Sequence, residues 1–283
     1  MSIVRLIVLA GIFLLVGHAH GQMFWSVTDE DGRQNWLLGT MHSEDPRLLD
    51  FPPALMDALR ESQRVALELV PDTSMLERLN QAMNYDSGRL NEVLEPDLYA
   101  RVVELLDQAY GMGEPAVRRM KPWAAAMTLS MPPPQTGLFM DLALSFRASG
   151  MGKDVVALET LDEQLAFLEG LSERAQIELL RQAVADFEQI DEVFETMIGL
   201  YLSSDLAALE EYSRGQLDDF DDEIASHFNQ VGLIDRNKVM LERAVPYLAE
   251  GGVLIAVGAL HLPGEHGLIE LMRQEGYTVE GIY

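Results

Sequence analysis

The chain has 283 residues, with 46 acidic and 20 basic side chains and a formal net charge of −26 at pH 7. This charge argues against nucleic-acid binding and against docking on anionic lipid headgroups, because both need a basic surface. The sequence contains no cysteine, which excludes disulfides, thiol catalysis and cysteine-ligated zinc. The length is sufficient for one large α/β domain or two small ones.

Residues 1–21 are typical of a secretory signal peptide. A short positive stretch precedes an apolar run over 6–17, which is too short for a comfortable membrane span, and small residues follow it. Cleavage after Ala19 or after Gly21 fits these small residues. We therefore expect an exported protein, periplasmic or secreted, with no stable membrane span once the signal is removed. An uncleaved N-terminal anchor is the alternative.

Short apolar runs predict strands near both ends of the mature chain and in its middle. Residues 23–27 and 34–40 flank an Asp-Gly step, which is typical of a hairpin turn. A further strand-like run covers 65–69. The later strands are predicted at 155–158, 253–257 and 278–283. Strands that alternate with helical segments indicate an α/β or α+β fold class.

Two long helical stretches separate these strands. The first covers roughly 72–149 and is interrupted by three consecutive prolines at 132–134, which neither a helix interior nor a central strand accommodates. The second covers roughly 172–249 and opens with an amphipathic helix predicted over 172–201, where apolar residues recur with a period near 3.6. We therefore expect an α/β fold with a central mixed sheet and a large helical insertion, or cap.

Two Gly-x-x-His phrases are the strongest functional signal. They occupy 39–42 and 258–261, and each follows a predicted buried strand. Open α/β sheets bind ligands at the carboxyl ends of their strands, so His42 and His261 stand where catalysis is expected. The two imidazoles belong to one site only if the fold makes the two strands neighbours.

Two glutamates end strand-like runs in a similar way. Glu68 lies within 65–69, and Glu159 follows 155–158. A carboxylate in an apolar strand is costly unless it is paired or bound to a metal. With two imidazoles, these carboxylates form a mixed nitrogen and oxygen donor set that suits Zn, Mn, Co or Fe(II) and leaves a position for water. Each glutamate could instead simply cap the helix that follows it.

Other polar positions are less distinctive. Arg236 and Asn237 open the helix before the most apolar strand, where they either point into the site or serve only as N-terminal helix residues. The acidic run at 217–223 lacks the ligand spacing and central glycine of a calcium loop, so we interpret it as a solvated helix face. His227 and His266 are interpreted as structural or surface residues. The sequence has no nucleophile elbow, phosphate loop, dinucleotide fingerprint or His-Glu-x-x-His helix.

Five phrases that carry these residues match the blocks of one known family in order and spacing. They lie at 36–42, 66–69, 157–160, 235–240 and 257–268. In these phrases the chain resembles the TraB/PrgY/GumN family, which includes the Tiki proteases that cleave Wnt proteins. A Gly-Leu-Asp block of the family is echoed more weakly by Gly137-Leu138, with the acid displaced to Asp141. We therefore treat 22–283 as one domain of this type.

The resemblance implies an α/β fold in which both Gly-x-x-His motifs face one site, and it implies metal-dependent peptide hydrolysis. On this basis we expect a divalent ion (Mn, Co or Zn) held by His42, His261 and one of the two glutamates, for which we take Glu159. The substrate would be a peptide or a protein.

The remaining residues are assigned from the same resemblance. Glu68 is expected to activate water, and Arg236 with Asn237 to stabilise the developing oxyanion. Two other functions fit the same residues. One is a non-catalytic envelope protein that binds a peptide, a haem or a metal, and the other is an accessory factor for envelope polysaccharide.

Overall fold

The structure is a computed structural model that describes residues 22–217 and 220–283. The predicted signal peptide at 1–21 lies outside the described residues. Within the described ranges, no helix combines the length and the apolarity that crossing a membrane requires.

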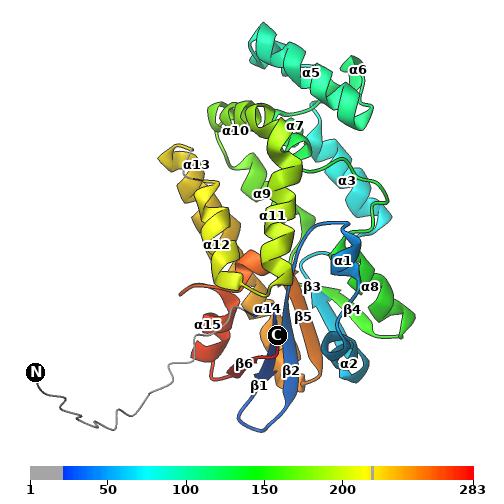
Figure 1. Ribbon diagram of the computed structural model, residues 1–283, viewed down its shortest axis with the longest axis vertical. Coiled ribbons are helices and arrows are strands. Elements are labelled where there is room, and N and C mark those ends of the chain that lie inside the picture. The colour runs from blue at the N-terminus through cyan, green and yellow to red at the C-terminus, as the bar shows by residue number, and fades with distance from the viewer. Residues whose placement is uncertain (1–21, 218–219) are drawn as a thin grey trace, which may run out of the picture.

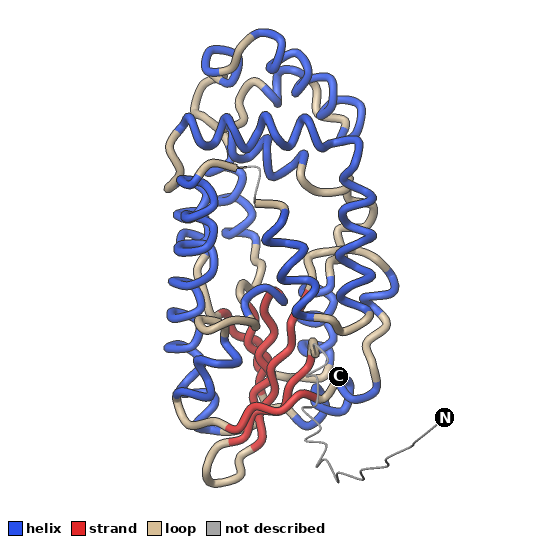
Figure 2. The backbone as a smooth tube through the Cα atoms, turned by 60° about the vertical axis from the view of Figure 1, so that its left-hand side comes forward, coloured by secondary structure: helices blue, strands red, loops and turns tan. Residues whose placement is uncertain are grey.

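A six-stranded mixed sheet forms the lower half of the molecule (Figures 1 and 2). Its strands are β1 (Phe24–Thr28), β2 (Gln34–Thr40), β3 (Arg64–Leu67), β4 (Asp154–Ala157), β5 (Val253–Gly258) and β6 (Thr278–Gly281). The strand order is β4-β3-β5-β2-β1-β6. The first four strands of this order run parallel, whereas β1 pairs antiparallel with both β2 and β6. The predicted mixed α/β architecture is therefore confirmed.

The strand sequences explain their places in the sheet. The central strand β5 reads Val-Leu-Ile-Ala-Val-Gly and is buried along almost its whole length, as expected of a parallel strand covered on both faces. The hairpin between β1 and β2 is present as predicted, and Gly32 adopts the positive φ of 80° that its turn requires. This hairpin lies at the bottom of Figure 1, so β2 and its parallel neighbours run upward.

Helices flank the sheet and form the upper part of the molecule (Figure 1). Before β4 they are α1 (Pro46–Leu49), α2 (Pro53–Glu61), α3 (Thr73–Met83), α4 (Leu90–Val93), α5 (Pro96–Tyr110), α6 (Glu114–Val117), α7 (Pro122–Leu129) and α8 (Met140–Gly150). After β4 they are α9 (Leu161–Glu169), α10 (Glu173–Asp186), α11 (Ile190–Leu202), α12 (Leu206–Gly215), α13 (Asp222–His227), α14 (Arg236–Glu250) and α15 (Leu268–Gln274). A 3₁₀ turn covers Phe187–Gln189, another covers Ala259–His261, and a π-helix covers Phe228–Asp235.

The molecule has two main hydrophobic cores. The larger one surrounds the sheet and includes apolar residues of α2, α8, α14 and α15. The second is built mainly by α5, α7 and α10, with buried residues such as Leu106, Trp123 and Leu180. In Figure 1 these helices lie above the carboxyl ends of the parallel strands. The second core therefore belongs to helices that stand away from the sheet.

Two helix predictions need correction. The single helix expected over 172–201 is two helices, α10 and α11, joined by a 3₁₀ turn. Its halves pack on different neighbours, α10 on α7 and α5 and α11 on α12 and α1, so the chain changes direction without a proline or glycine. The acidic run at 217–223, of which 218–219 lie outside the described residues, is not a helix face throughout. Its Asp221 caps the N-terminus of α13.

Candidate active site

The four parallel strands bring their carboxyl ends side by side. Thr40 of β2 pairs with Gly258 of β5, and Leu67 of β3 pairs with both Ala256 of β5 and Ala157 of β4. The β3–β4 pairing continues beyond the strands, because the backbone N–H of Glu159 donates to the carbonyl oxygen of Glu68 at 3.0 Å. The structure thus places the continuations of all four strands at one edge of the sheet.

Arg236 lies between the two predicted glutamates. Its Nη2 is 2.8 Å from Oε2 of Glu68 and 2.6 Å from Oε2 of Glu159, and its Nε donates to Oε1 of Glu159 at 2.8 Å. Glu159 is buried, with 1% of its side chain exposed. Gln164 of α9 donates to Oε2 of both glutamates, at 3.1 and 3.2 Å. The three charged groups therefore form one hydrogen-bonded cluster.

The pKa of Arg236 reflects this cluster. Burial alone would lower it, but the hydrogen bond to Glu159 and the negative charges of both glutamates raise it above its usual value. Arg236 is the first residue of α14, directly after the π-helix. Such π segments often occur where a helix must place a functional side chain. The sequence indicated the arginine but not its partners, one of which is 77 residues away.

Asn237 orients His261. Its Nδ2 donates to the backbone oxygen of His266 at 2.8 Å, so its Oδ1 faces Nδ1 of His261, which lies 2.7 Å away. Because Oδ1 only accepts hydrogen bonds, Nδ1 of His261 must carry the ring proton. The pKa of His261 is lowered by burial, against the opposing influence of the Glu68 charge, and this favours the neutral ring.

The free ring nitrogen of His261 faces a carboxylate. Its Nε2 lies 3.7 Å from Oε1 of Glu68. With the proton on Nδ1, a lone pair of Nε2 and a carboxylate oxygen face each other without a hydrogen between them. Two acceptors in this arrangement suit a cation between them. A carbonyl or amide oxygen on the other ring nitrogen is also the usual support of a metal-binding histidine.

The glycines of both motifs are required by close packing. The backbone N–H of Gly258 donates to Oε1 of Glu68 at 2.7 Å, and a Cβ at this position would lie 3.2 Å from the same oxygen. A Cβ at Gly39 would lie 3.0 Å from the Cα of Ala259. The carbonyl of Gly39 accepts a 2.7 Å hydrogen bond from the buried hydroxyl of Tyr201. Each glycine therefore lets one motif approach a neighbouring segment.

His42 has different surroundings from His261. Its side chain is 61% exposed, and its ring stacks on Phe139 with 3.9 Å between the ring centroids. Its Nδ1 lies 3.7 Å from Oδ2 of Asp141, whose other oxygen accepts a short hydrogen bond from Thr40. His42 and His261 follow neighbouring strands, but they contact different groups. In the sequence, Asp141 is only a displaced match to the acid of a family Gly-Leu-Asp block, and no pattern indicates Phe139 or Gln164.

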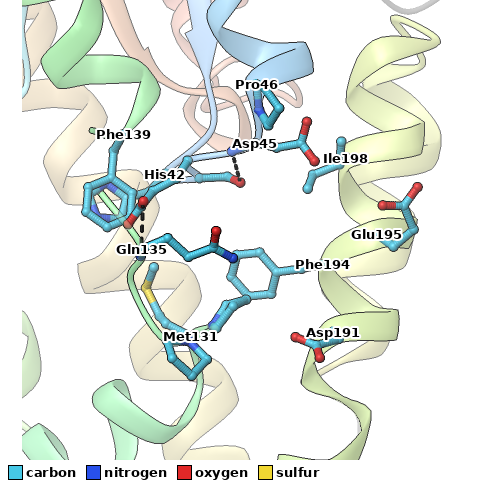
Figure 3. Close-up of a pocket in the computed structure, with 14 residues that line it drawn as sticks. His42, Asp45, Pro46, Met131, Gln135, Phe139, Asp191, Phe194, Glu195 and Ile198 are labelled. Atoms are coloured by element: carbon cyan, nitrogen blue, oxygen red, sulfur yellow. Dashed lines mark hydrogen bonds between the residues drawn. The ribbon is translucent and has the colours of Figure 1, made fainter. Parts of the chain in front are cut away.

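A pocket of about 270 Å³ lies beside His42. Figure 3 shows it between the loop after β2, the proline-rich loop before α8, and α11.

A divalent ion at a catalytic site is usually held by three protein ligands. Across 22–217 and 220–283, no three histidine, aspartate or glutamate side chains are close enough together to hold an ion. The pair formed by His261 Nε2 and Glu68 Oε1 fits two positions of such a site by its chemistry and by its 3.7 Å separation. Glu159 has both oxygens bound by Arg236, so this arrangement offers no free oxygen of Glu159 to a metal.

Comparison with known proteins defines the class. Residues 23–281 match the model of the TraB/PrgY/gumN family, so the chain belongs to this family. It is 26% identical to the metalloprotease TIKI1 of Danio rerio over 87% of this chain and 60% of that protein. It is 25% identical to the metalloprotease TIKI1 of Homo sapiens over 87% of this chain and 59% of that protein. The chain thus spans about three-fifths of the length of these relatives. No solved structure matches the chain.

Proposed function

We propose that this protein is a metal-dependent peptide hydrolase whose site lies at the carboxyl ends of β2, β3 and β5. The observation that carries the proposal is the 3.7 Å approach of His261 Nε2 to Glu68 Oε1, with the other nitrogen of His261 fixed by Asn237. Family membership and two relatives named as metalloproteases support the same reaction class.

His261 and Glu68 are the ligands in this proposal. His42 would become the third only by turning its exposed ring from Phe139 towards this pair, because no three such side chains lie close enough together within the described residues. The exposed ring of His42 follows the strand next to His261 and is restrained by stacking and one 3.7 Å contact. A divalent ion at this position would lower the pKa of bound water and polarise a peptide carbonyl. Of the two glutamates first considered as ligands, we retain Glu68. Arg236 binds both oxygens of Glu159, whereas Oε1 of Glu68 accepts only the neutral backbone N–H of Gly258 and lies 3.7 Å from His261 Nε2.

Arg236 and Asn237 act as positioning residues in this account. Arg236 fixes Oε2 of Glu68 and balances the charge of Glu159, which leaves Oε1 of Glu68 directed to His261. Asn237 selects the protonated nitrogen of His261. We therefore propose these roles in place of the oxyanion stabilisation expected from the sequence, since their polar atoms are used within the protein.

The position of the helices and the N-terminal sequence complete the proposal. The helices of the second core stand above the strand ends (Figure 1), and we propose that they serve as a cap over the substrate.

The segment at 1–21 has the pattern of a signal peptide, and we propose an exported protein, periplasmic or secreted. Sequencing the N-terminus of the protein recovered from cell fractions tests this location.

Turnover of a peptide library tests the reaction. The chelator-treated protein is assayed alone and with Mn²⁺, Co²⁺ or Zn²⁺, together with His261→Ala, Glu68→Gln and a control. The control is His266→Ala, which removes an exposed ring and keeps the backbone oxygen that holds Asn237. We expect metal-dependent cleavage that falls about a hundredfold or more in the first two variants and stays unchanged in the control. Equal cleavage in all variants would reject the proposal. Tight peptide capture without product would instead favour the non-catalytic binding protein considered above.

A further inference from the structure

The pocket beside His42 has a shape and charge of its own. Three segments far apart in the sequence form it, namely 42–46, 131–139 and 191–198. Its volume of about 270 Å³ lies near the lower end of the range for small-molecule sites and suits one long side chain. Figure 3 shows His42 against Phe139 on one side of the pocket and Phe194 of α11 on the other. An occupant of this pocket would therefore lie next to the first Gly-x-x-His motif.

The walls of the pocket are apolar and its charges are acidic. Met131, three prolines, Phe139, Phe194 and Ile198 supply the apolar surface. Glu44, Asp45, Asp191 and Glu195 supply four carboxylates. Apolar walls with acidic ends match a side chain that has a methylene stem and a cationic head.

Only some of these carboxylates are neutralised by the protein. Arg47 binds both Asp45 and Glu195, with its Nη2 at 2.8 and 2.6 Å from their oxygens. Glu44 accepts hydrogen bonds through Oε2, from the backbone N–H groups of residues 135 and 136 and from the hydroxyl of Thr136. Within the described ranges, Oε1 of Glu44 is buried without a hydrogen-bond partner, and Asp191 makes no hydrogen bond or ion pair through its side chain. The pocket therefore keeps negative charge that no cation of the described residues offsets.

We infer that this pocket binds a lysine or arginine side chain of the peptide substrate, next to the bond that is cleaved. The inference rests on the proposed function, because it places the substrate against His42. The methylene stem would pack between Phe139 and Phe194, and the cationic head would be bound by Asp191 at the start of α11. The net charge of −26 adds a long-range attraction for basic peptides.

Binding of short peptides tests the inference without requiring turnover. Fluorescein-labelled Ala-Ala-X-Ala-Ala peptides, with X as lysine, norleucine or glutamate, are titrated with the chelator-treated full chain and followed by fluorescence anisotropy. We expect the lysine peptide to bind about tenfold more tightly than the norleucine peptide, since one charge-assisted contact separates them. The glutamate peptide should bind most weakly.

Variants of α11 identify the responsible charge. Asp191→Asn should reduce the preference for lysine over norleucine to within about twofold, and Asp191→Lys should reverse the preference between the lysine and glutamate peptides. Glu192→Gln is the matched control, because Glu192 also lies in the first turn of α11 but does not line the pocket. Equal binding of lysine and norleucine peptides, or an unchanged preference in Asp191→Asn, would overturn the inference.

Parallel turnover assays separate the two proposals. Cleavage of all three peptides at equal rates, together with equal binding, would reject the pocket assignment and leave the hydrolase proposal standing. A lysine preference in binding that depends on Asp191, with no cleavage under any metal, would reject hydrolysis and leave the pocket assignment standing.

Discussion

The backbone N–H of Gly258 donates a 2.7 Å hydrogen bond to Oε1 of Glu68, and this short approach connects the second Gly-x-x-His motif to the end of β3. Gly258 has φ −50° and ψ 134°, which any residue can adopt. The glycine is therefore required by space and not by backbone conformation, because a Cβ would lie 3.2 Å from the carboxylate oxygen.

Gly258→Ala should consequently impair the site more than the fold. The added methyl group would displace Glu68 by a few tenths of an ångström and weaken its hydrogen bond to the backbone. We expect metal affinity to fall about tenfold, while the free energy of unfolding changes by less than about 1 kcal/mol. Calorimetric metal titration and urea unfolding measure these two effects. Gly199→Ala is the control. Gly199 lies within α11, and a Cβ there would have no neighbouring atom within 4 Å, so metal affinity should stay unchanged. Unchanged affinity in Gly258→Ala would contradict this role of Glu68.

Asn237→Leu tests the orientation of His261. The variant removes the acceptor that holds the proton on Nδ1, and the ring is then free to present either nitrogen to Glu68. Loss of such a supporting residue typically lowers metal affinity or activity ten- to a hundredfold. We expect a loss of this size in kcat or in metal affinity, measured after urea unfolding has shown that the variant is folded. Wild-type values for both quantities would refute the positioning role.

Arg236→Met should strongly destabilise the protein. The change leaves the carboxylates of Glu68 and the buried Glu159 without the cation that binds both of them. Breaking a buried ion pair from one side typically costs about 3–5 kcal/mol of unfolding free energy, which urea denaturation will measure. Arg174→Met is the matched control, because Arg174 pairs with two acids on the exposed surface and should have no measurable effect. Similar unfolding curves for the two variants would show that the buried cluster is not essential to stability.

The pH dependence of stability should include a contribution from Glu163. Hydrogen bonds from Arg243 are the main cause that lowers the pKa of Glu163 to about 2 in the folded protein, from a usual value of 4.5. A lowered folded-state pKa contributes stability above the unfolded value, and this contribution disappears as the pH falls from about 4.5 towards 2. The difference in urea midpoint between wild type and Glu163→Gln should therefore be largest near neutral pH and shrink below pH 4.5. A constant difference across this range would contradict the assignment.

The sequence was a good guide to the sheet and a partial guide to the site. Strands such as β2 and β5 were predictable because continuous apolar runs are typical of buried parallel strands. The two motifs lie on neighbouring strands because β2 pairs with β5, with Thr40 opposite Gly258, and the sequence alone does not predict this pairing. The break between α10 and α11 could not be predicted, because the apolar period continues through it.

Within the site, ion pairs between residues far apart in the sequence limit what the sequence alone can predict. Glu68, Glu159 and Arg236 were identified as polar residues in unusual places, but their mutual neutralisation depends on partners 77 and 168 residues apart. The contrast between the exposed ring of His42 and the buried ring of His261 is likewise absent from two nearly identical motifs. Local patterns identify such residues, whereas tertiary packing decides which of them remain free to bind a ligand.

Calorimetric titration of the chelator-treated protein with Mn²⁺, Co²⁺ and Zn²⁺ measures whether His261 and Glu68 hold a divalent ion. We expect one ion per chain for at least one of these metals, with binding abolished in His261→Ala and in Glu68→Gln and retained in His266→Ala. Equal metal binding by wild type and His261→Ala would contradict this expectation, and so would a wild-type protein that binds none of the three ions.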